Sequence, residues 1–170
     1  MTSDFGHDHD DHEGHEHGHE SAAIDADQHR ALAVGLFNHV WELLSTPDRT
    51  PAMDAQMVHA AHASRFHWGQ VGGPEQWAVG EWQCSRVYAV LGRSEPALHH
   101  ARASLQICEE GSLGDWVIAA AYEALARASA VAGDEAAKRA WLTKADEAVA
   151  AIADAEDRAV IEADLASLET

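Results

Sequence analysis

Proline and glycine interrupt this chain at short, regular intervals, and this spacing limits which folds it can adopt. Between the interruptions, apolar residues recur three and four positions apart, as they do along one face of an α-helix. A helix does not continue through the proline and glycine breaks. No stretch alternates apolar and polar residues in the manner of a half-buried β-strand. The pattern therefore predicts an all-α fold of about seven helices joined by short turns.

The turns divide the chain into a series of helical segments that starts near residue 26 and runs to the C-terminal end. We expect helices over residues 25–44, 53–71, 75–91, 96–110, 116–132, 135–153 and 155–168. Ser94 and Asp115 stand at positions where a polar side chain can cap the following helix. Short connections of this kind place consecutive helices antiparallel, so the segments predict stacked helical hairpins.

Two consecutive helix pairs share one arrangement, in which a helix, a glycine turn and an alanine-rich second helix follow each other. Their turn glycines, Gly92 and Gly133, lie 41 residues apart. Here the chain resembles the tetratricopeptide class of helical-hairpin repeats. The matching positions are Ser85, Tyr88, Gly92, Ala97 and Leu105 in the first unit, and Ala126, Gly133, Asp134 and Ala145 in the second. The period exceeds the usual value of about 34 residues, and Ser129 stands where an aromatic residue is common.

The resemblance extends over about residues 75–150, with residues 26–72 forming a more divergent hairpin before them. It is shared with uncharacterised bacterial proteins of the same class. The resemblance implies a stacked array whose concave face holds a partner protein or peptide. It implies no chemistry.

The first 25 residues differ in composition from everything that follows. Residues 1–29 contain nine Asp and Glu residues and no Lys or Arg, in a chain whose formal net charge is −18. Apart from Phe5 and Ile24 they contain almost no large apolar side chains, so they bury too little surface to offset chain entropy. We therefore expect a disordered tail over residues 1–25, rich in His, Asp and Glu, before a helical domain over residues 26–170.

The tail contains six histidines within fourteen positions: His7, His9, His12, His15, His17 and His19. Imidazole nitrogens bind Zn²⁺, Ni²⁺ and Cu²⁺, and the acidic residues between them add oxygen ligands and a negative field. The segment resembles the metal-loading stretches of bacterial zinc- and nickel-handling proteins. A purification tag is an uninterrupted histidine run, which this segment is not. The tail therefore predicts binding of a divalent transition metal, and the alternative is an acidic tail without a function.

A second group of histidines lies within the helix expected over residues 53–71. His59 and His62 are three positions apart and project 60° from each other around the helix axis. They can hold a metal ion if a facing helix supplies a carboxylate, for which Glu81 and Glu123 are candidates. His39 on the first helix can reach the same space. The alternatives are a polar pocket without a metal and ordinary packing of partly buried histidines.

Aromatic and basic residues around the second turn and the helix over residues 75–91 predict a surface for a ligand or a partner. These residues are Trp68, Trp77, Arg86 and Tyr88. The alternative is that the aromatic rings wedge neighbouring hairpins together. Glu81 and Arg86 lie five positions apart, which does not suit an ion pair within one helix. We therefore expect each of them to bind a neighbouring helix.

Several functions are disfavoured by what the sequence contains. The acidic balance repels nucleic acids and anionic membranes. No glycine-rich phosphate loop or dinucleotide fingerprint is present, so we expect no nucleotide cofactor. The sequence has no run of apolar residues that could span a bilayer and no basic–apolar secretory segment, and we expect a cytoplasmic protein. In that compartment Cys84 and Cys108 are expected to be buried, reduced thiols.

Three functions stay open. The favoured one is a tetratricopeptide-like binding protein whose tail handles Zn²⁺, Ni²⁺ or Cu²⁺ as an accessory, chaperone or sensor, with a protein or peptide on the concave face. The second is a metal-dependent enzyme with a site formed by His59, His62 and Glu81 or Glu123. The third is a plain interaction scaffold with an incidental acidic tail.

Overall fold

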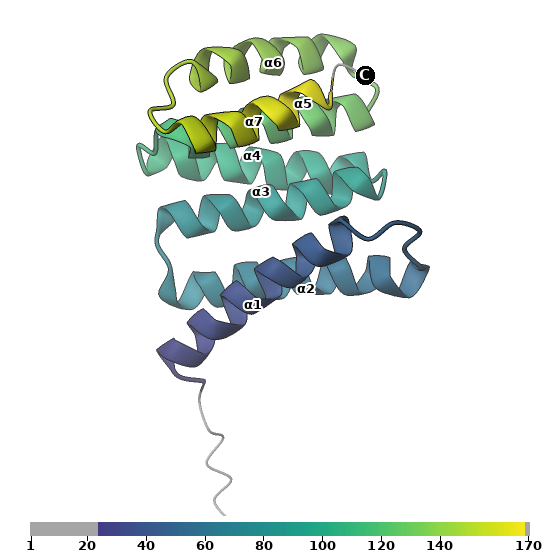
Figure 1. Cartoon of the computed structure of the whole chain (residues 1–170), viewed down its shortest axis with the longest axis vertical. Helices are drawn as coiled ribbons and strands as arrows, with labels where there is room; N and C mark the ends of the chain where they lie inside the picture. Colours follow the sequence, from purple (N-terminus) through teal and green to yellow (C-terminus); the bar gives the residue numbers. More distant parts are fainter. Residues whose placement is uncertain (1–23, 169–170) are drawn as a thin grey trace, which may run out of the picture.

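A computed structural model describes residues 24–168, which form seven α-helices and no strand. The helices are α1 (Ala26–Leu44), α2 (Pro51–Val71), α3 (Pro74–Val90), α4 (Ser94–Glu110), α5 (Asp115–Val131), α6 (Glu135–Val149) and α7 (Ala155–Ala166). They stack in chain order as antiparallel hairpins, from α1 and α2 at one end to α5 and α6 at the other (Figure 1). The expected all-α fold of about seven helices is confirmed for this part of the chain.

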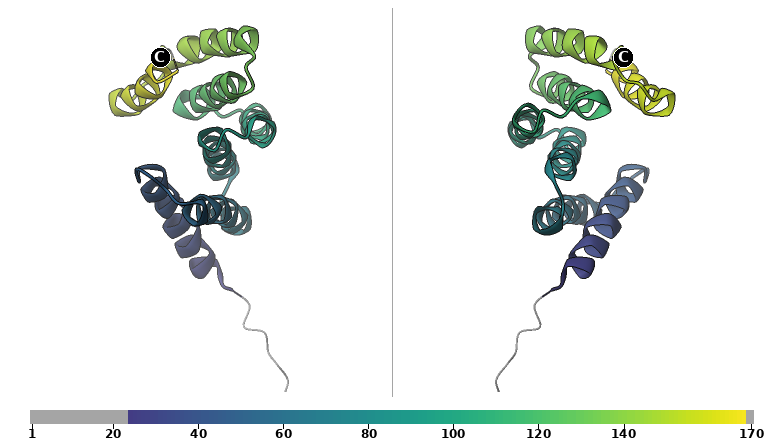
Figure 2. Two further views of the ribbon diagram at one scale, coloured as in Figure 1. Left: turned by 90° about the vertical axis from the view of Figure 1, so that its right-hand side faces the viewer. Right: turned by 90° about the vertical axis from the view of Figure 1, so that its left-hand side faces the viewer.

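The stack is curved, and one of its sides is bordered by a helix at each end. Viewed from the side, α1 and α7 project in the same direction, with α3 and α5 between them and α4 on the opposite side (Figure 2). We call the side bordered by α1 and α7 the inner face. The last helix does not extend the stack, because α7 folds back beside α5.

The start of α2 differs from its expected position because Pro51 opens the helix. Thr50 is the N-cap, and its side chain accepts a hydrogen bond from the backbone N–H of Met53. The first turn of a helix has no intrahelical partner for its N–H groups, so proline fits there without losing a hydrogen bond. The helix therefore begins two residues before the expected start at Met53.

The beginning of α5 also differs, because Asp115 is its first residue and not its cap. The cap is Gly114, and Asp115 has a φ of +56°. The Asp115 carboxylate accepts a hydrogen bond of 3.3 Å from the backbone N–H of Ala153, in the segment between α6 and α7. The side chain expected to cap one helix thus connects two distant parts of the chain.

The two glycines that mark the tetratricopeptide-like turns have left-handed backbone conformations. The φ angles of Gly92 and Gly133 are +69° and +72°. A side chain disfavours this region, so glycine is the residue that ends α3 and α5 at the lowest cost. After each glycine the chain reverses into the next helix of the hairpin.

The core is built largely from small side chains, which let the helices approach closely. In α5 the buried residues include six alanines, at positions 119, 120, 121, 124, 126 and 128, with Leu125 and Val117 as larger neighbours. One apolar cluster, containing Leu125 and Ile161, extends through all the helices from α3 to α7. A second cluster, containing Val40 and Met57, joins α1, α2 and α3. The two ends of the stack are therefore centred on different clusters, which adjoin where Phe37 and Trp41 of α1 pack against the first cluster.

No helix among residues 24–168 has both the length and the apolar character needed to cross a bilayer.

Both cysteines are buried and unbridged, as expected. Burial raises the pKa of the Cys84 thiol to about 12 and that of Cys108 to about 11. At pH 8 both groups are therefore protonated, and the reactive thiolate is scarce.

We expect the two cysteines of native protein to react with an aromatic disulfide reagent at least 100-fold more slowly than those of protein in 6 M guanidinium chloride. The unfolded protein should release about two equivalents of chromophore. Fast labelling of one native thiol would contradict this burial.

Candidate functional site

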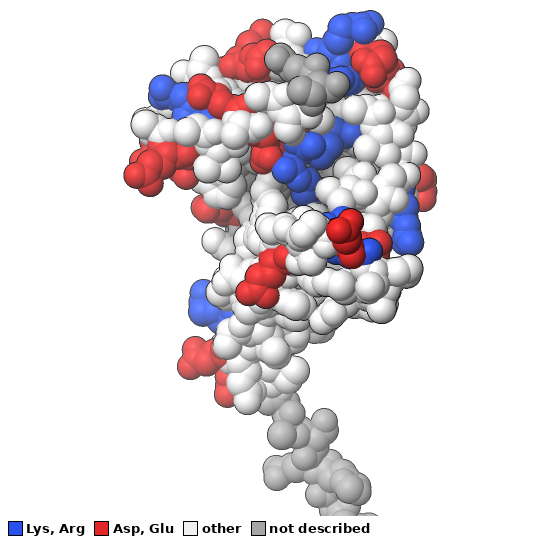
Figure 3. All heavy atoms as spheres, turned by 45° about the vertical axis from the view of Figure 1, so that its right-hand side comes forward, with Lys and Arg blue, Asp and Glu red and all other residues white. Residues whose placement is uncertain are grey.

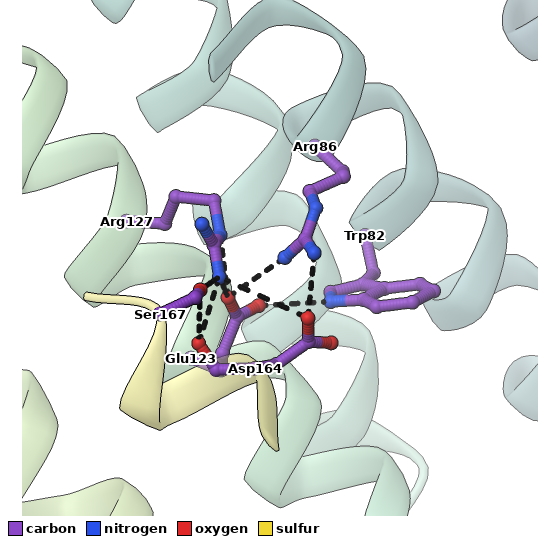
Figure 4. Close-up of polar contacts among 6 residues, drawn as sticks. All are labelled: Trp82, Arg86, Glu123, Arg127, Asp164 and Ser167. Carbon is purple, nitrogen blue, oxygen red and sulfur yellow. Dashed lines mark hydrogen bonds and ion pairs between the residues drawn. The ribbon is translucent and has the colours of Figure 1, made fainter. Parts of the chain in front are cut away.

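The inner face contains a cluster of charged side chains contributed by three helices (Figure 4). Its members are Trp82 and Arg86 from α3, Glu123 and Arg127 from α5, and Asp164 and Ser167 at the end of α7. Residues four positions apart on a helix share a face, so each pair from α3 and α5 points toward the same space. We call this group the inner charge cluster.

Glu123 is the centre of the inner charge cluster and is completely buried. Its carboxylate accepts hydrogen bonds from Trp82 Nε1 at 3.2 Å, Arg86 Nη1 at 3.1 Å and Arg127 Nε at 2.6 Å. A carboxylate removed from water is stable only when ionic and hydrogen-bonding partners replace the lost solvation. The two guanidinium groups and the indole N–H supply these partners.

Asp164 and Ser167 attach α7 to the same arginines. Arg86 Nη2 donates to the Asp164 carboxylate at 2.5 Å, and Arg127 Nη2 donates to Ser167 Oγ at 2.9 Å and to the Asp164 backbone carbonyl at 3.0 Å. Two guanidinium groups therefore face two carboxylates, and the formal charges sum to zero. Arg86 and Arg127 keep side-chain exposures of 16% and 15%. Basic side chains reach the surface in the middle of the side shown in Figure 3.

A second polar cluster lies between α2, α3 and α4 and contains some of the expected site residues. Glu81 accepts hydrogen bonds from Arg65 Nε at 2.9 Å and from His100 Nδ1 at 2.7 Å. His62 Nε2 lies 2.9 Å from the hydroxyl of Tyr88, whose ring stacks on that of His100. The expectation that Glu81 and Arg86 bind neighbouring helices, and not each other, is confirmed by these contacts and by those of the inner charge cluster.

The charges of this second cluster are balanced by its own members. Burial lowers the pKa of His62, and His100 and His59 lower it further while Glu81 opposes them. Burial alone would raise the pKa of Glu81, but the hydrogen bonds and charges of His100 and Arg65 outweigh it and lower that pKa. The arrangement therefore favours an ionised Glu81 beside a neutral His62.

The structure distributes the body residues expected to bind a metal over several places. His59 lines a depression with Pro51 and Arg93, and His39 contacts Glu42 on its own helix and Gln56. His62 and Glu81 share the second cluster, whereas Glu123 lies in the inner charge cluster. Within residues 24–168, no group of three or more His, Cys, Asp or Glu side chains is arranged to hold a metal ion. The six tail histidines lie outside the described residues.

The four residues expected to form a ligand surface also lie in separate neighbourhoods. Trp68 lines a mostly apolar pocket of about 190 Å³ on the inner face, whose other lining residues are Val34, Phe37, Glu75, Gln76, Val79 and Trp116. Trp77 Nε1 donates to the Trp68 backbone carbonyl at 3.0 Å. Arg86 belongs to the inner charge cluster, and Tyr88 to the cluster with His62. The pocket and the inner charge cluster are therefore two distinct features of the inner face.

Arg65 and His100 were not predicted from the sequence as partners of Glu81. The positions of the turns indicate which residues of neighbouring helices lie at the same height. Arg65 and Glu81 are nearly equidistant from the turn at Gly72 and Gly73, whereas Glu81 and His100 lie 11 and 8 positions from Gly92. Residues equidistant from the turn of an antiparallel helical hairpin lie at the same height. Counting outward from the turn would therefore have paired Arg65 with Glu81 but not Glu81 with His100.

Neither a family model, nor a curated protein, nor a solved structure matches this chain.

Proposed function

We propose that this chain is a binding protein that handles a divalent transition metal through its His-rich N-terminal segment. The helical array serves as its platform for a partner protein. The observation that carries the proposal is the stretch from His7 to Glu20, in which six histidines alternate with acidic residues and glycines and no basic residue occurs.

The chemistry of this stretch suits Zn²⁺, Ni²⁺ or Cu²⁺. Neutral imidazoles are strong ligands for all three ions, and the carboxylates raise the local cation concentration. Gly14 and Gly18 allow the backbone to arrange the ligands in many ways, which fits a segment that collects and passes on metal better than one that holds it in fixed geometry. Because protonated imidazole does not bind metal, affinity should decrease as the pH falls below about 6.

The inner face supports the platform role. Its apolar pocket, lined by Phe37, Val79 and Trp116 among others, suits an apolar side chain of a partner segment. The helices that line this pocket come from three successive hairpins, so a bound segment would contact several of them. The proposal therefore separates two tasks, with the metal on the N-terminal segment and the partner on the array.

The test is the metal content of untagged full-length protein, measured by elemental analysis after equilibration with Zn²⁺, Ni²⁺ or Cu²⁺ near neutral pH. We expect the wild type to bind at least one equivalent of metal more than a variant in which the six tail histidines are replaced with serine. A matched control replaces the exposed His99 with serine and should keep the wild-type stoichiometry. Equal metal content in the tail variant and the wild type would contradict the proposal.

The same measurement separates the two other functions. For the enzyme with a body site, the tail variant would keep one tightly bound metal that a further His59→Ala, His62→Ala change removes. For the plain scaffold, wild-type protein would bind none of the three ions. Each function therefore predicts a different pattern of stoichiometries.

A further inference from the structure

Two histidines from different helices meet at the end of the α1–α2 hairpin that is remote from its connecting turn. His29 is the fourth residue of α1, and His67 lies four residues before the end of α2. Their Nδ1 atoms are 2.7 Å apart, and their ring centroids are 4.9 Å apart. Both side chains are half-buried, so one side of the pair is open to solvent.

We propose that His29 and His67 form a binding site for a divalent transition metal, with Zn²⁺, Ni²⁺ or Cu²⁺ held between their two Nδ1 atoms. Water completes the coordination. This site is separate from the six histidines of the N-terminal segment, and it rests on the proposed function only in that the segment supplies the ion.

The geometry of the pair is close to that of two ligands of one ion. Two imidazole nitrogens bound to tetrahedral Zn²⁺ at 2.0–2.1 Å are about 3.3 Å apart. The rings therefore need to separate by about 0.6 Å, which small side-chain rotations can provide. In the metal-free pair, one Nδ1–H donates to the other Nδ1. When the ion binds, this proton leaves Nδ1 and that ring takes the tautomer protonated at Nε2, so both Nδ1 lone pairs face the metal.

The surroundings of the pair favour a cation and a neutral imidazole. Burial lowers the pKa of His67, and the neighbouring His29 lowers it further, which favours the neutral ring. His67 lies near the C-terminal end of α2, where the carbonyl groups give the helix its negative pole. Asp25, the N-cap of α1, and Asp27 in its first turn give this end of the helix negative charge. No such combination surrounds His99, which is exposed on α4.

The position in the sequence gives the site a source of metal. His19, the last histidine of the N-terminal segment, precedes His29 by ten residues. A tether of this length keeps an ion carried by the segment at a high effective concentration near the pair. A metal that joins α1 to α2 also stabilises the folded chain, because the unfolded chain does not hold the two rings together.

The experiment uses full-length protein in which the six tail histidines are serine, so that only body sites can bind. Titrated with ZnCl₂, this protein should bind one equivalent, and its Tm should rise by about 5–10 °C at a Zn²⁺ concentration near 100 times Kd. In the ¹H–¹⁵N spectrum of the imidazoles, the Nδ1 resonances of two histidines should shift. Absence of both the Tm rise and the shifts would overturn the proposal.

Variants in the same background assign the site to these residues. His29→Ala with His67→Ala should abolish the Tm rise, whereas the matched pair His39→Ala with His99→Ala should preserve it. A rise that survives the first pair would overturn the proposal. If the first pair does not fold, the imidazole spectra decide the question, because they observe the site in a protein where both rings are intact.

The two proposals fail in different ways. If the N-terminal segment does not collect metal, the tail variant and the wild type bind equal amounts. If His29 and His67 are not ligands, the wild type loses its metal with the tail histidines, and no rise in Tm is left in the tail variant.

Discussion

Replacing Glu123 with glutamine should lower the free energy of unfolding by about 3 kcal/mol or more. The substitution preserves the size of the side chain but removes the negative charge that Arg86 and Arg127 share inside the inner charge cluster. Asp164 then faces both guanidinium groups alone, and the amide cannot serve all the donors that now contact the carboxylate. Urea denaturation followed by circular dichroism measures the change as a lower midpoint with little change in slope.

Two further variants sharpen this test. Glu147→Gln removes an exposed carboxylate from α6 and should change stability by less than about 0.5 kcal/mol. Combining Glu123→Leu with Arg86→Met and Arg127→Met should recover part of the loss, because apolar groups of similar volume can replace a buried ion-pair network. A loss of less than about 1 kcal/mol for Glu123→Gln would show that water or a rearranged Asp164 compensates for the missing charge.

Replacing Met57 with alanine should cost about 2–5 kcal/mol and should act mainly on one end of the stack. Met57 is completely buried in the cluster that joins α1, α2 and α3. In a linear array each unit contacts only its neighbours, so a cavity at one end weakens that end first. Hydrogen exchange should therefore show a larger loss of protection in α1 and α2 than in α5 and α6.

The control for this prediction is Val160→Ala on α7, where the side chain is 59% exposed and little packing is lost. Its free energy of unfolding should stay within about 0.5 kcal/mol of the wild type. Equal loss of protection in all helices of the Met57 variant would contradict the separation into two clusters and would indicate that the stack unfolds as a single unit.

Local patterns in the sequence were sufficient to predict the helices, because proline and glycine act on the backbone next to them. Gly92 and Gly133 end their helices in the expected places, and their positive φ angles explain why. The errors at Pro51 and Asp115 have a common origin, since a turn residue can belong to the helix that follows it or to the loop before it. At Pro51 the hydrogen bond from Met53 N–H to the Thr50 side chain shows that Thr50 is the cap. At Asp115 the hydrogen bond from Ala153 N–H shows that the carboxylate is used elsewhere and does not cap the helix.

The candidate sites were less predictable because their members are distant in sequence. Arg86 contacts Glu123 and Asp164, which lie 37 and 78 positions away, and His29 meets His67 across 38 positions. The contacts of Arg86 depend on how the hairpins stack, and the contact between His29 and His67 depends on the register of the α1–α2 hairpin. Nothing in the local pattern of residues 155–168 indicates that α7 turns back beside α5, yet this return adds Asp164 and Ser167 to the inner charge cluster.

Because α7 folds back onto the inner face, it competes with any partner for the side chains of Arg86 and Arg127. Asp164 and Ser167 occupy hydrogen-bond donors of Arg86 and Arg127 that an acidic group of a partner would otherwise use. A segment tethered within the same molecule has an effective concentration in the millimolar range. A partner that engages these arginines must therefore displace α7, and its apparent affinity is reduced in proportion to the fraction of molecules in which the helix is already released. Selectivity at this end of the inner face thus depends on whether a partner binds Arg86 and Arg127 more strongly than α7 does.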